Sequence, residues 1–160
     1  MIAPGDTLPD VNLTIMGPEG PEPVSTDELF GAGTSVLFAV PGAFTPTCSA
    51  QHLPGYIANR EQLGEKGVDR IVCMAVNDIF VMNAWGEHGG VDDGITMAAD
   101  GNGEFARAIG LTFDASAFGM GERAQRFAIV IRDGKVDQLF VEAPGEFRVS
   151  SAEHVLDQLS

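Results

Sequence analysis

The sequence predicts an α/β domain in which helices flank a mixed central β-sheet, and three observations carry this prediction. Continuous apolar runs such as TSVLFAV at 34–40 are typical of strands that are covered on both faces of a sheet. Helical patterns separate these runs along the chain. The last two β-rich runs flank Asp133-Gly134, which is a strong signal for a hairpin. Parallel strands joined by helices and followed by an antiparallel hairpin make a mixed sheet.

The first part of the chain is predicted as a loop that leads into alternating strands and helices. The segment MGPEGPEPVS is dense in Gly and Pro, which indicates a loop. A helix is expected at about 46–64, and Pro54-Gly55 should kink it. RIVCMAV at 70–76 is predicted as a second buried strand, and a helix over 78–88 has Asp78 as its candidate N-cap.

The second half continues the alternation and ends in the hairpin and a helix. A short strand is expected at 94–100, a short helix at 103–111, and the hairpin within 126–143. SSAEHVLDQLS gives a terminal helix, with Ser150 and Glu153 spaced as a capping box. This order is what a thioredoxin-like fold shows, and the length predicts a single domain over residues 1–160.

Composition and charge restrict the function classes. The chain carries 9 Lys and Arg against 23 Asp and Glu, a formal net charge of −14. Such a surface repels phosphate backbones and anionic lipid, so neither nucleic acid nor a membrane is expected as a partner. No apolar run approaches the roughly 18 residues of a membrane span. The N-terminus shows no basic region and no long apolar core, so no signal peptide is visible and a cytoplasmic location is expected.

The 2 cysteines and 3 histidines do not form a disulfide framework or a metal site in the sequence. There is no CxxC, and no Cys/His cluster has zinc-ligand spacing, so no metal is expected. Cys73 lies inside the apolar strand pattern RIVCMAV. It is therefore expected to be a structural core residue, and burial should raise the pKa of its thiol.

Cys48 has a different setting, in the stretch VPGAFTPTCSAQHLPG. Thr45 can serve as a helix N-cap with Pro46 as the first helical residue, which puts Cys48 in the first turn. Free backbone N–H groups and the positive end of the helix dipole favour a thiolate there. A free cysteine thiol has a pKa of about 8.5, and this kind of setting can lower that pKa. The placement predicts a reactive nucleophile; the alternative is a small buried apolar residue.

The stretch PGAFTPTCS also resembles the active-site motif P-x-x-x-T-x-x-C of peroxiredoxins of the AhpC/TSA family, and specifically the peroxiredoxin 5 (type II) subgroup. Further matches follow in order over most of the chain, in CSAQHLPGY, VCMAVNDIFVMNAWG and RFAIVIRDGKV. The resemblance implies a thiol-dependent peroxidase on a thioredoxin fold that reduces hydrogen peroxide and alkyl hydroperoxides and needs no bound cofactor. It implies Cys48 as the peroxidatic cysteine, Thr45 and Arg126 as activating residues, and Pro41 as a shield.

The chemistry of these residue types agrees with the implied roles. The fixed charge of Arg126 favours a thiolate, and its N–H groups can donate to a peroxide oxygen. The Thr45 hydroxyl can accept from the peroxide and donate to the sulfur. Arg123 is a weaker candidate for a supporting role. His52, one helical turn after Cys48, is interpreted as a polar or packing residue.

The C-terminal region differs from that of some subgroup members, which carry a resolving cysteine there. In this chain, PGEFRVSSAEHVL has Ser150 and Ser151 and no cysteine. The expectation is a one-Cys cycle in which an external thiol reduces the sulfenic acid: glutathione with glutaredoxin, or alternatively thioredoxin. Cys73 remains the internal candidate for a resolving cysteine.

Two further expectations concern assembly and an alternative function. Four aromatic residues near predicted loops and helix starts either pack in the core or form a homodimer interface, as such loops do in the subgroup: Phe44, Phe80, Trp85 and Phe118. A homodimer is expected. A peroxide sensor or redox-signalling module with little turnover is the alternative function, because it needs the same thiolate.

Overall fold

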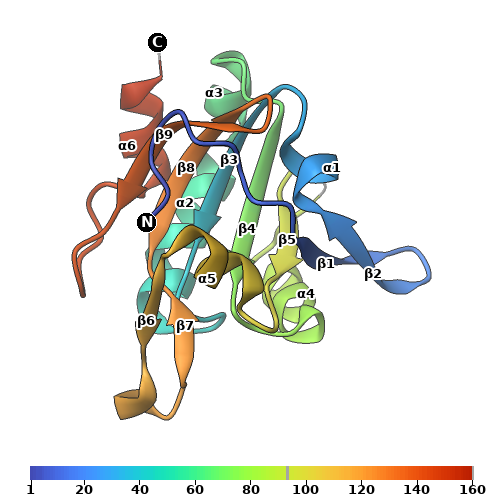
Figure 1. Ribbon diagram of the computed structural model, residues 1–160, viewed down its shortest axis with the longest axis vertical. Helices are drawn as coiled ribbons and strands as arrows, with labels where there is room; N and C mark the ends of the chain where they lie inside the picture. The colour runs from blue at the N-terminus through green and yellow to red at the C-terminus, as the bar shows by residue number, and fades with distance from the viewer. Residues whose placement is uncertain (93, 160) are drawn as a thin grey trace.

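A seven-stranded mixed sheet forms the centre of the computed structural model, which describes residues 1–92 and 94–159 (Figure 1). The strand order is β2-β1-β5-β4-β3-β8-β9. Strands β3, β4 and β5 are parallel, whereas β8 pairs antiparallel with β3, and β1 pairs antiparallel with β5. The strands are β1 (Asn12–Gly17), β2 (Gly20–Ser25), β3 (Thr34–Ala39), β4 (Arg70–Ala75), β5 (Thr96–Ala99), β8 (Phe127–Arg132) and β9 (Lys135–Val141). The mixed sheet flanked by helices confirms the predicted fold class.

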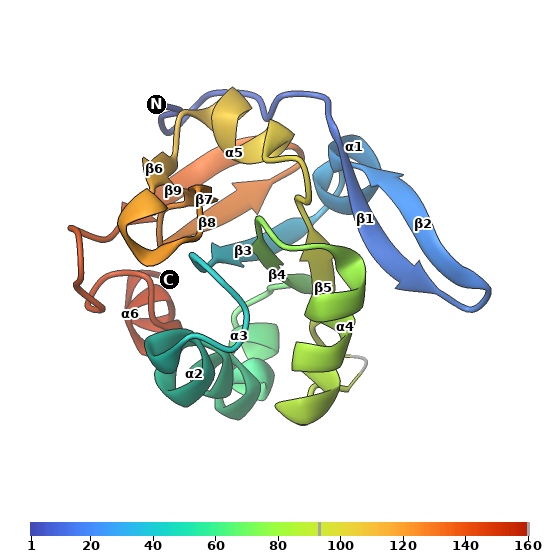
Figure 2. The ribbon, with the colours of Figure 1, turned by 90° about the horizontal axis from the view of Figure 1, so that it is seen from below.

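Helices cover both faces of this sheet (Figure 2). One face carries α2 (Leu53–Ala58), α3 (Arg60–Glu65), α4 (Ile79–His88) and α6 (Ala152–Gln158), and the other carries α1 (Thr26–Phe30) and α5 (Glu104–Ile109). Along β3, Val36 and Phe38 belong to one buried cluster, and Leu37 and Ala39 belong to the other. Both faces of the strand are covered, as its unbroken apolar run predicts. None of the helices in the described ranges is long and apolar enough to cross a membrane.

The Gly- and Pro-rich segment predicted as a loop is instead part of the edge hairpin β1–β2. Asn12 pairs with Ser25 at one end, and Gly17 pairs with Gly20 at the turn. β2 contains Pro21 and Pro23, which a central strand would exclude because proline cannot donate to the sheet. The prediction was wrong because β2 lies at the edge, where one side of the strand needs no donors.

The helical segment after β3 is interrupted differently from the prediction. Cys48–His52 form a single wide π turn, in which the Leu53 N–H donates to the Cys48 carbonyl. Pro54 therefore follows an irregular turn and does not kink a continuous helix. The break between α2 and α3 falls at Asn59, where φ is −104° and ψ is 11°.

The remaining elements confirm most of the predicted order. Asp78 caps α4 by accepting from the Val81 N–H at 2.9 Å. The hairpin turn has positive φ at Asp133 and Gly134, as its sequence predicts. The N-cap of α6 is Ser151, one residue later than predicted. A small hairpin of β6 (Thr112–Asp114) and β7 (Glu122–Ala124), with a 3₁₀ turn at Ser116–Phe118, was not predicted.

Two glycines test how backbone conformation contributes to stability. A Cβ added at Gly64 in α3, or at Gly67 just beyond it, would meet no atom within 4 Å, but Gly67 has a φ of +91°. Gly64→Ala should raise the free energy of unfolding by about 0.5–1 kcal/mol, because alanine restricts the unfolded chain. Gly67→Ala should lower it by about 1 kcal/mol, because a side chain is strained at positive φ. Urea denaturation measures both, and changes of the same sign would contradict the argument.

Candidate active site

The loop after β3 places Cys48 at the start of a helix. The Val40 N–H donates to the Met74 carbonyl at 3.0 Å, which extends the sheet contacts by one residue. The Ala43 N–H then donates to Asn77 Oδ1 at 2.9 Å, so the loop after β4 holds the loop after β3 in place. The Ser49 N–H donates to the Thr45 carbonyl at 2.9 Å, and the first helical turn therefore begins where it was predicted to begin. Cys48 is fully buried in that turn.

The Thr45 side chain lies against the sulfur and does not cap a backbone amide of the turn. Its Oγ1 is 2.7 Å from Cys48 Sγ and 2.7 Å from the Gly42 carbonyl oxygen. A hydroxyl has one proton and two lone pairs, so it donates to one of these acceptors at a time. When the sulfur is a thiolate, the hydroxyl can donate to it; when the proton points to Gly42, a lone pair of the oxygen is free to accept.

Arg126 also contacts the Cys48 sulfur. It lies between β7 and β8, and its Nη2 donates to Cys48 Sγ at 3.0 Å. Its Nη1 lies 2.9 Å from His52 Nδ1, and its guanidinium carbon lies 5.9 Å from the centre of the Phe147 ring. A permanent positive charge at this distance stabilises a negative sulfur. The structure thus brings the predicted residues Cys48, Thr45 and Arg126 into direct contact.

His52 does more than the packing role assigned from the sequence. Because guanidinium nitrogens only donate, His52 Nδ1 accepts from Arg126, and the ring proton is on Nε2. Nε2 donates to the Ser150 carbonyl at 3.0 Å. Burial, followed by the charge of Arg126, lowers the pKa of His52 to about 3. The imidazole is therefore neutral, and it fixes the orientation of the guanidinium.

Three more residues support His52, and the sequence analysis assigned none of them to the site. The Tyr56 hydroxyl also donates to the Ser150 carbonyl, at 2.8 Å. Glu142 accepts from the backbone N–H and the hydroxyl of Ser150 at 2.8 and 2.7 Å. Tyr56 had a signal in its position four residues after His52, on the same face of a helix. Glu142 and the Ser150 carbonyl had none, because a loop conformation decides what they contact.

Pro41 lines an open pocket that also includes Arg126, the residue that contacts the Cys48 sulfur. The pocket has a volume of about 550 Å³, and its wall includes Pro41, Thr47 and Arg126. Its remaining wall is largely apolar and consists of Phe113, Phe118, Gln125, Glu142, Ala143, Pro144, Gly145 and Glu146. Arg123 donates to the carbonyls of Met120 at 2.9 Å and Pro41 at 3.3 Å, so it contacts the Pro41 loop.

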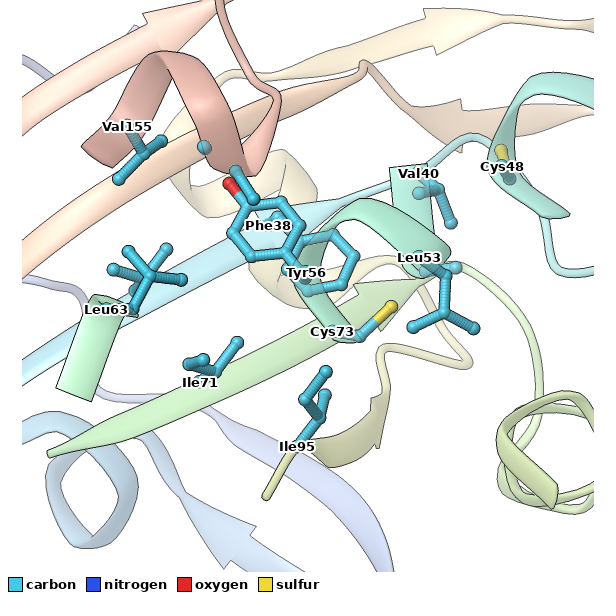
Figure 3. Close-up of a cluster of buried hydrophobic side chains, with 14 of the residues drawn as sticks. Phe38, Val40, Cys48, Leu53, Tyr56, Leu63, Ile71, Cys73, Ile95 and Val155 are labelled. Atoms are coloured by element: carbon cyan, nitrogen blue, oxygen red, sulfur yellow. The ribbon is translucent and has the colours of Figure 1, made fainter. Parts of the chain in front are cut away.

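Cys73 contrasts with Cys48. It lies in β4 opposite Phe38 and is fully buried. Burial, followed by the nearby Cys48, raises the pKa of the Cys73 thiol. Both cysteines are free thiols in one apolar cluster but come from different elements (Figure 3). Within the described residues, no group of three or more His, Cys, Asp or Glu side chains could hold a metal ion.

The buried neutral His52 makes stability depend on pH. As the pH falls from about 6.5 towards 3, the unfolded chain binds a proton at His52 that the folded chain does not bind. The free energy of unfolding should therefore decrease over this range, by up to about 1.4 kcal/mol per pH unit from this group. In His52→Asn, urea denaturation should show a shallower decrease between about pH 5 and 6.5, above the range where carboxylates titrate. Parallel curves for the two proteins would contradict the assignment.

Comparisons with known proteins agree with this geometry. The model of the redoxin family matches residues 3–156. Peroxiredoxin-2B of Arabidopsis thaliana is 44% identical over 99% of this chain and 98% of its own length. Two solved structures are also similar. Reduced Prx3 of Vibrio vulnificus in complex with hydrogen peroxide has a TM-score of 0.96 and 51% identity, covering 100% of both chains. Peroxiredoxin 5 of Alvinella pompejana has a TM-score of 0.86 and 34% identity, covering 99% and 98%. A sulfur held between a threonine and an arginine on this fold, together with these similarities, shows that the chain belongs to the peroxiredoxins, thiol peroxidases of the AhpC/TSA family.

Proposed function

We propose that this peroxiredoxin reduces hydrogen peroxide and alkyl hydroperoxides at Cys48, with Thr45, Arg126 and Pro41 completing the catalytic site. The observation that carries the proposal is the position of Cys48 Sγ, 2.7 Å from the Thr45 hydroxyl and 3.0 Å from Arg126 Nη2. The proposal extends to this chain the hydrogen peroxide bound by the Vibrio vulnificus relative.

The proposed reaction is a displacement at oxygen. The Cys48 thiolate attacks one peroxide oxygen, an S–O bond forms and the O–O bond breaks. Cys48 becomes a sulfenic acid, and the leaving alkoxide or hydroxide takes up a proton to give an alcohol or water. Arg126 donates hydrogen bonds to the oxygens on which negative charge grows, and the Thr45 oxygen accepts a hydrogen bond from the peroxide O–H group. Pro41 has no N–H group and acts as a shield that limits water near the sulfur.

We further propose that the sulfenic acid is reduced by an external thiol in a one-Cys cycle. The buried Cys73 has a raised thiol pKa and is a poor nucleophile, since the thiolate is the reactive form. The C-terminal region PGEFRVSSAEHVL contains Ser150 and Ser151 and no cysteine, so it offers no internal thiol to react with the sulfenic acid. One glutathione would form a mixed disulfide with Cys48 and release water. The thiol of glutaredoxin would then take the glutathione from Cys48 and restore its thiol, and a second glutathione would release oxidised glutathione from glutaredoxin. Thioredoxin is the alternative reductant.

Intact mass after one equivalent of hydrogen peroxide tests both parts of this proposal. Wild type and Cys73→Ser should each gain one oxygen atom, and with glutathione each should instead gain one glutathione. Turnover with glutathione and glutaredoxin should agree within about twofold for the two proteins, because burial removes Cys73 from the cycle. Cys48→Ser is the inactive control.

Three outcomes would contradict the proposal. Loss of two hydrogens from the wild type, absent in Cys73→Ser, would indicate an internal disulfide. Failure of the wild type to react with peroxide would overturn the assignment of Cys48. A single oxidation without turnover under any reductant would favour the sensor.

We also propose a homodimer, based on exposed aromatic side chains. Trp85 is in the core, but Phe44, Phe80 and Phe118 are 50%, 65% and 78% exposed. Sedimentation velocity should show a dimer. Phe80→Glu should shift it towards monomer, because a charge at an apolar interface is costly. Asn102→Glu, which adds the same charge at an exposed turn, is the control. A wild type that is monomeric at micromolar concentration would contradict the proposal.

A further inference from the structure

We propose that Glu142 is a positioning residue for Arg126, and that it acts through the loop 143–150 and His52. The inference rests on peroxidase chemistry at Cys48. The inference goes beyond that chemistry because it assigns a role to the Glu142 carboxylate. Among the described residues, the hydrogen bonds of this carboxylate go to Arg148, Val149 and Ser150, and not to the sulfur or the guanidinium.

The carboxylate of Glu142 holds together a loop that has no helix or strand of its own. Its Oε2 accepts from the N–H groups of Arg148, Val149 and Ser150, each at 2.8 Å, and from the Ser150 hydroxyl at 2.7 Å. Oε1 accepts from the Arg148 N–H at 2.9 Å. Burial would raise the pKa of Glu142, but these hydrogen bonds outweigh it, and the pKa lies below its usual value. One ionised oxygen therefore fixes three consecutive residues.

The last of these residues contacts the site directly. The Ser150 carbonyl accepts from His52 Nε2 at 3.0 Å, and His52 Nδ1 accepts from Arg126 Nη1 at 2.9 Å. The other end of the guanidinium, Nη2, donates to Cys48 Sγ. A displaced Ser150 carbonyl would release the imidazole, and the guanidinium would lose the acceptor that directs Nη2 at the sulfur.

Glu142 is also joined to Arg126 through the main chain. It directly follows β9, and its N–H donates to the Arg126 carbonyl at 3.0 Å. The same residue thus fixes the backbone of Arg126 and, through the loop, the acceptor for its side chain. Among the described residues, Arg126 forms no salt bridge with a carboxylate. Its charge is therefore not shared with Glu142, whose oxygens are occupied by the loop.

A double-mutant cycle tests this inference. The rate of oxidation by hydrogen peroxide can be followed through Trp85, the chain's one tryptophan, which donates to Ser49 Oγ at 3.0 Å beside Cys48. Glu142→Ala and His52→Leu should each slow oxidation by about tenfold or more. The double variant should be no more than about threefold slower than the slower single variant, because both remove the same support.

Two further variants separate positioning from general loosening of the fold. Glu142→Gln should keep the rate within about threefold, because one amide oxygen can replace the oxygen that makes most of the bonds. Asp100→Ala removes another buried carboxylate that accepts from two backbone amides, those of Phe105 and Ala106. Asp100→Ala should lower the melting temperature about as much as Glu142→Ala does, but it should leave the oxidation rate within about twofold of the wild-type rate.

Each outcome decides the question. If Glu142→Ala does not fold cooperatively, the shorter Glu142→Asp replaces it in the cycle, with a smaller expected loss. A wild-type rate in Glu142→Ala, or in Glu142→Asp where it replaces the alanine variant, would overturn the inference. So would multiplicative losses in the double variant, or an equal loss in Asp100→Ala. A wild type that does not react with peroxide would instead refute the proposed function.

Discussion

The contact between Arg126 Nη2 and Cys48 Sγ, at 3.0 Å, is the interaction on which the rest of the site depends. It places a guanidinium beside a fully buried sulfur, where a charge lacking a partner would be costly. The fold makes the contact possible because Ala39 at the end of β3 pairs with Phe127 at the start of β8. The loop that leads from β3 to Cys48 begins just after this pair, and Arg126 comes just before it. The two therefore meet at the same end of these central strands. The neutral His52 then holds the other end of the guanidinium without competing for its charge.

The two cysteines show how position in one fold decides the chemistry of a thiol. Both are fully buried and belong to the same apolar cluster. Cys73 is surrounded by strand and helix side chains, and burial disfavours its charged form. Cys48 lies in an irregular first turn, against a hydroxyl and a guanidinium. The two cysteines are equally buried, so what distinguishes their surroundings is the set of hydrogen-bond donors around each sulfur.

Much of this could be predicted from the sequence, and the failures have physical reasons. Apolar runs identified β3 and β4, because residues covered on both faces leave an unbroken pattern. The TPTC stretch identified the Cys48 turn, because helix starts depend on local residues. The β1–β2 hairpin was missed because its prolines are tolerated only at a sheet edge, and edge position depends on the assembled sheet. Ser150 was assigned to a capping box, whereas Glu142, eight positions earlier, binds its hydroxyl. Contacts of that kind depend on tertiary structure and leave no local pattern.

The pocket lined by Pro41 and Arg126 has a consequence for the two halves of the proposed cycle. Its wall includes Glu146, and the chain as a whole carries a net charge of −14. A neutral peroxide approaches this surface without an electrostatic penalty, whereas a thiol tripeptide with ionised carboxyl groups is repelled. Dissolved salt shortens the range of that repulsion to about 10 Å at 0.1 M. Higher ionic strength would thus accelerate recycling by such a reductant and leave the encounter with the oxidant unaffected, so only one half of the proposed cycle would depend on the medium.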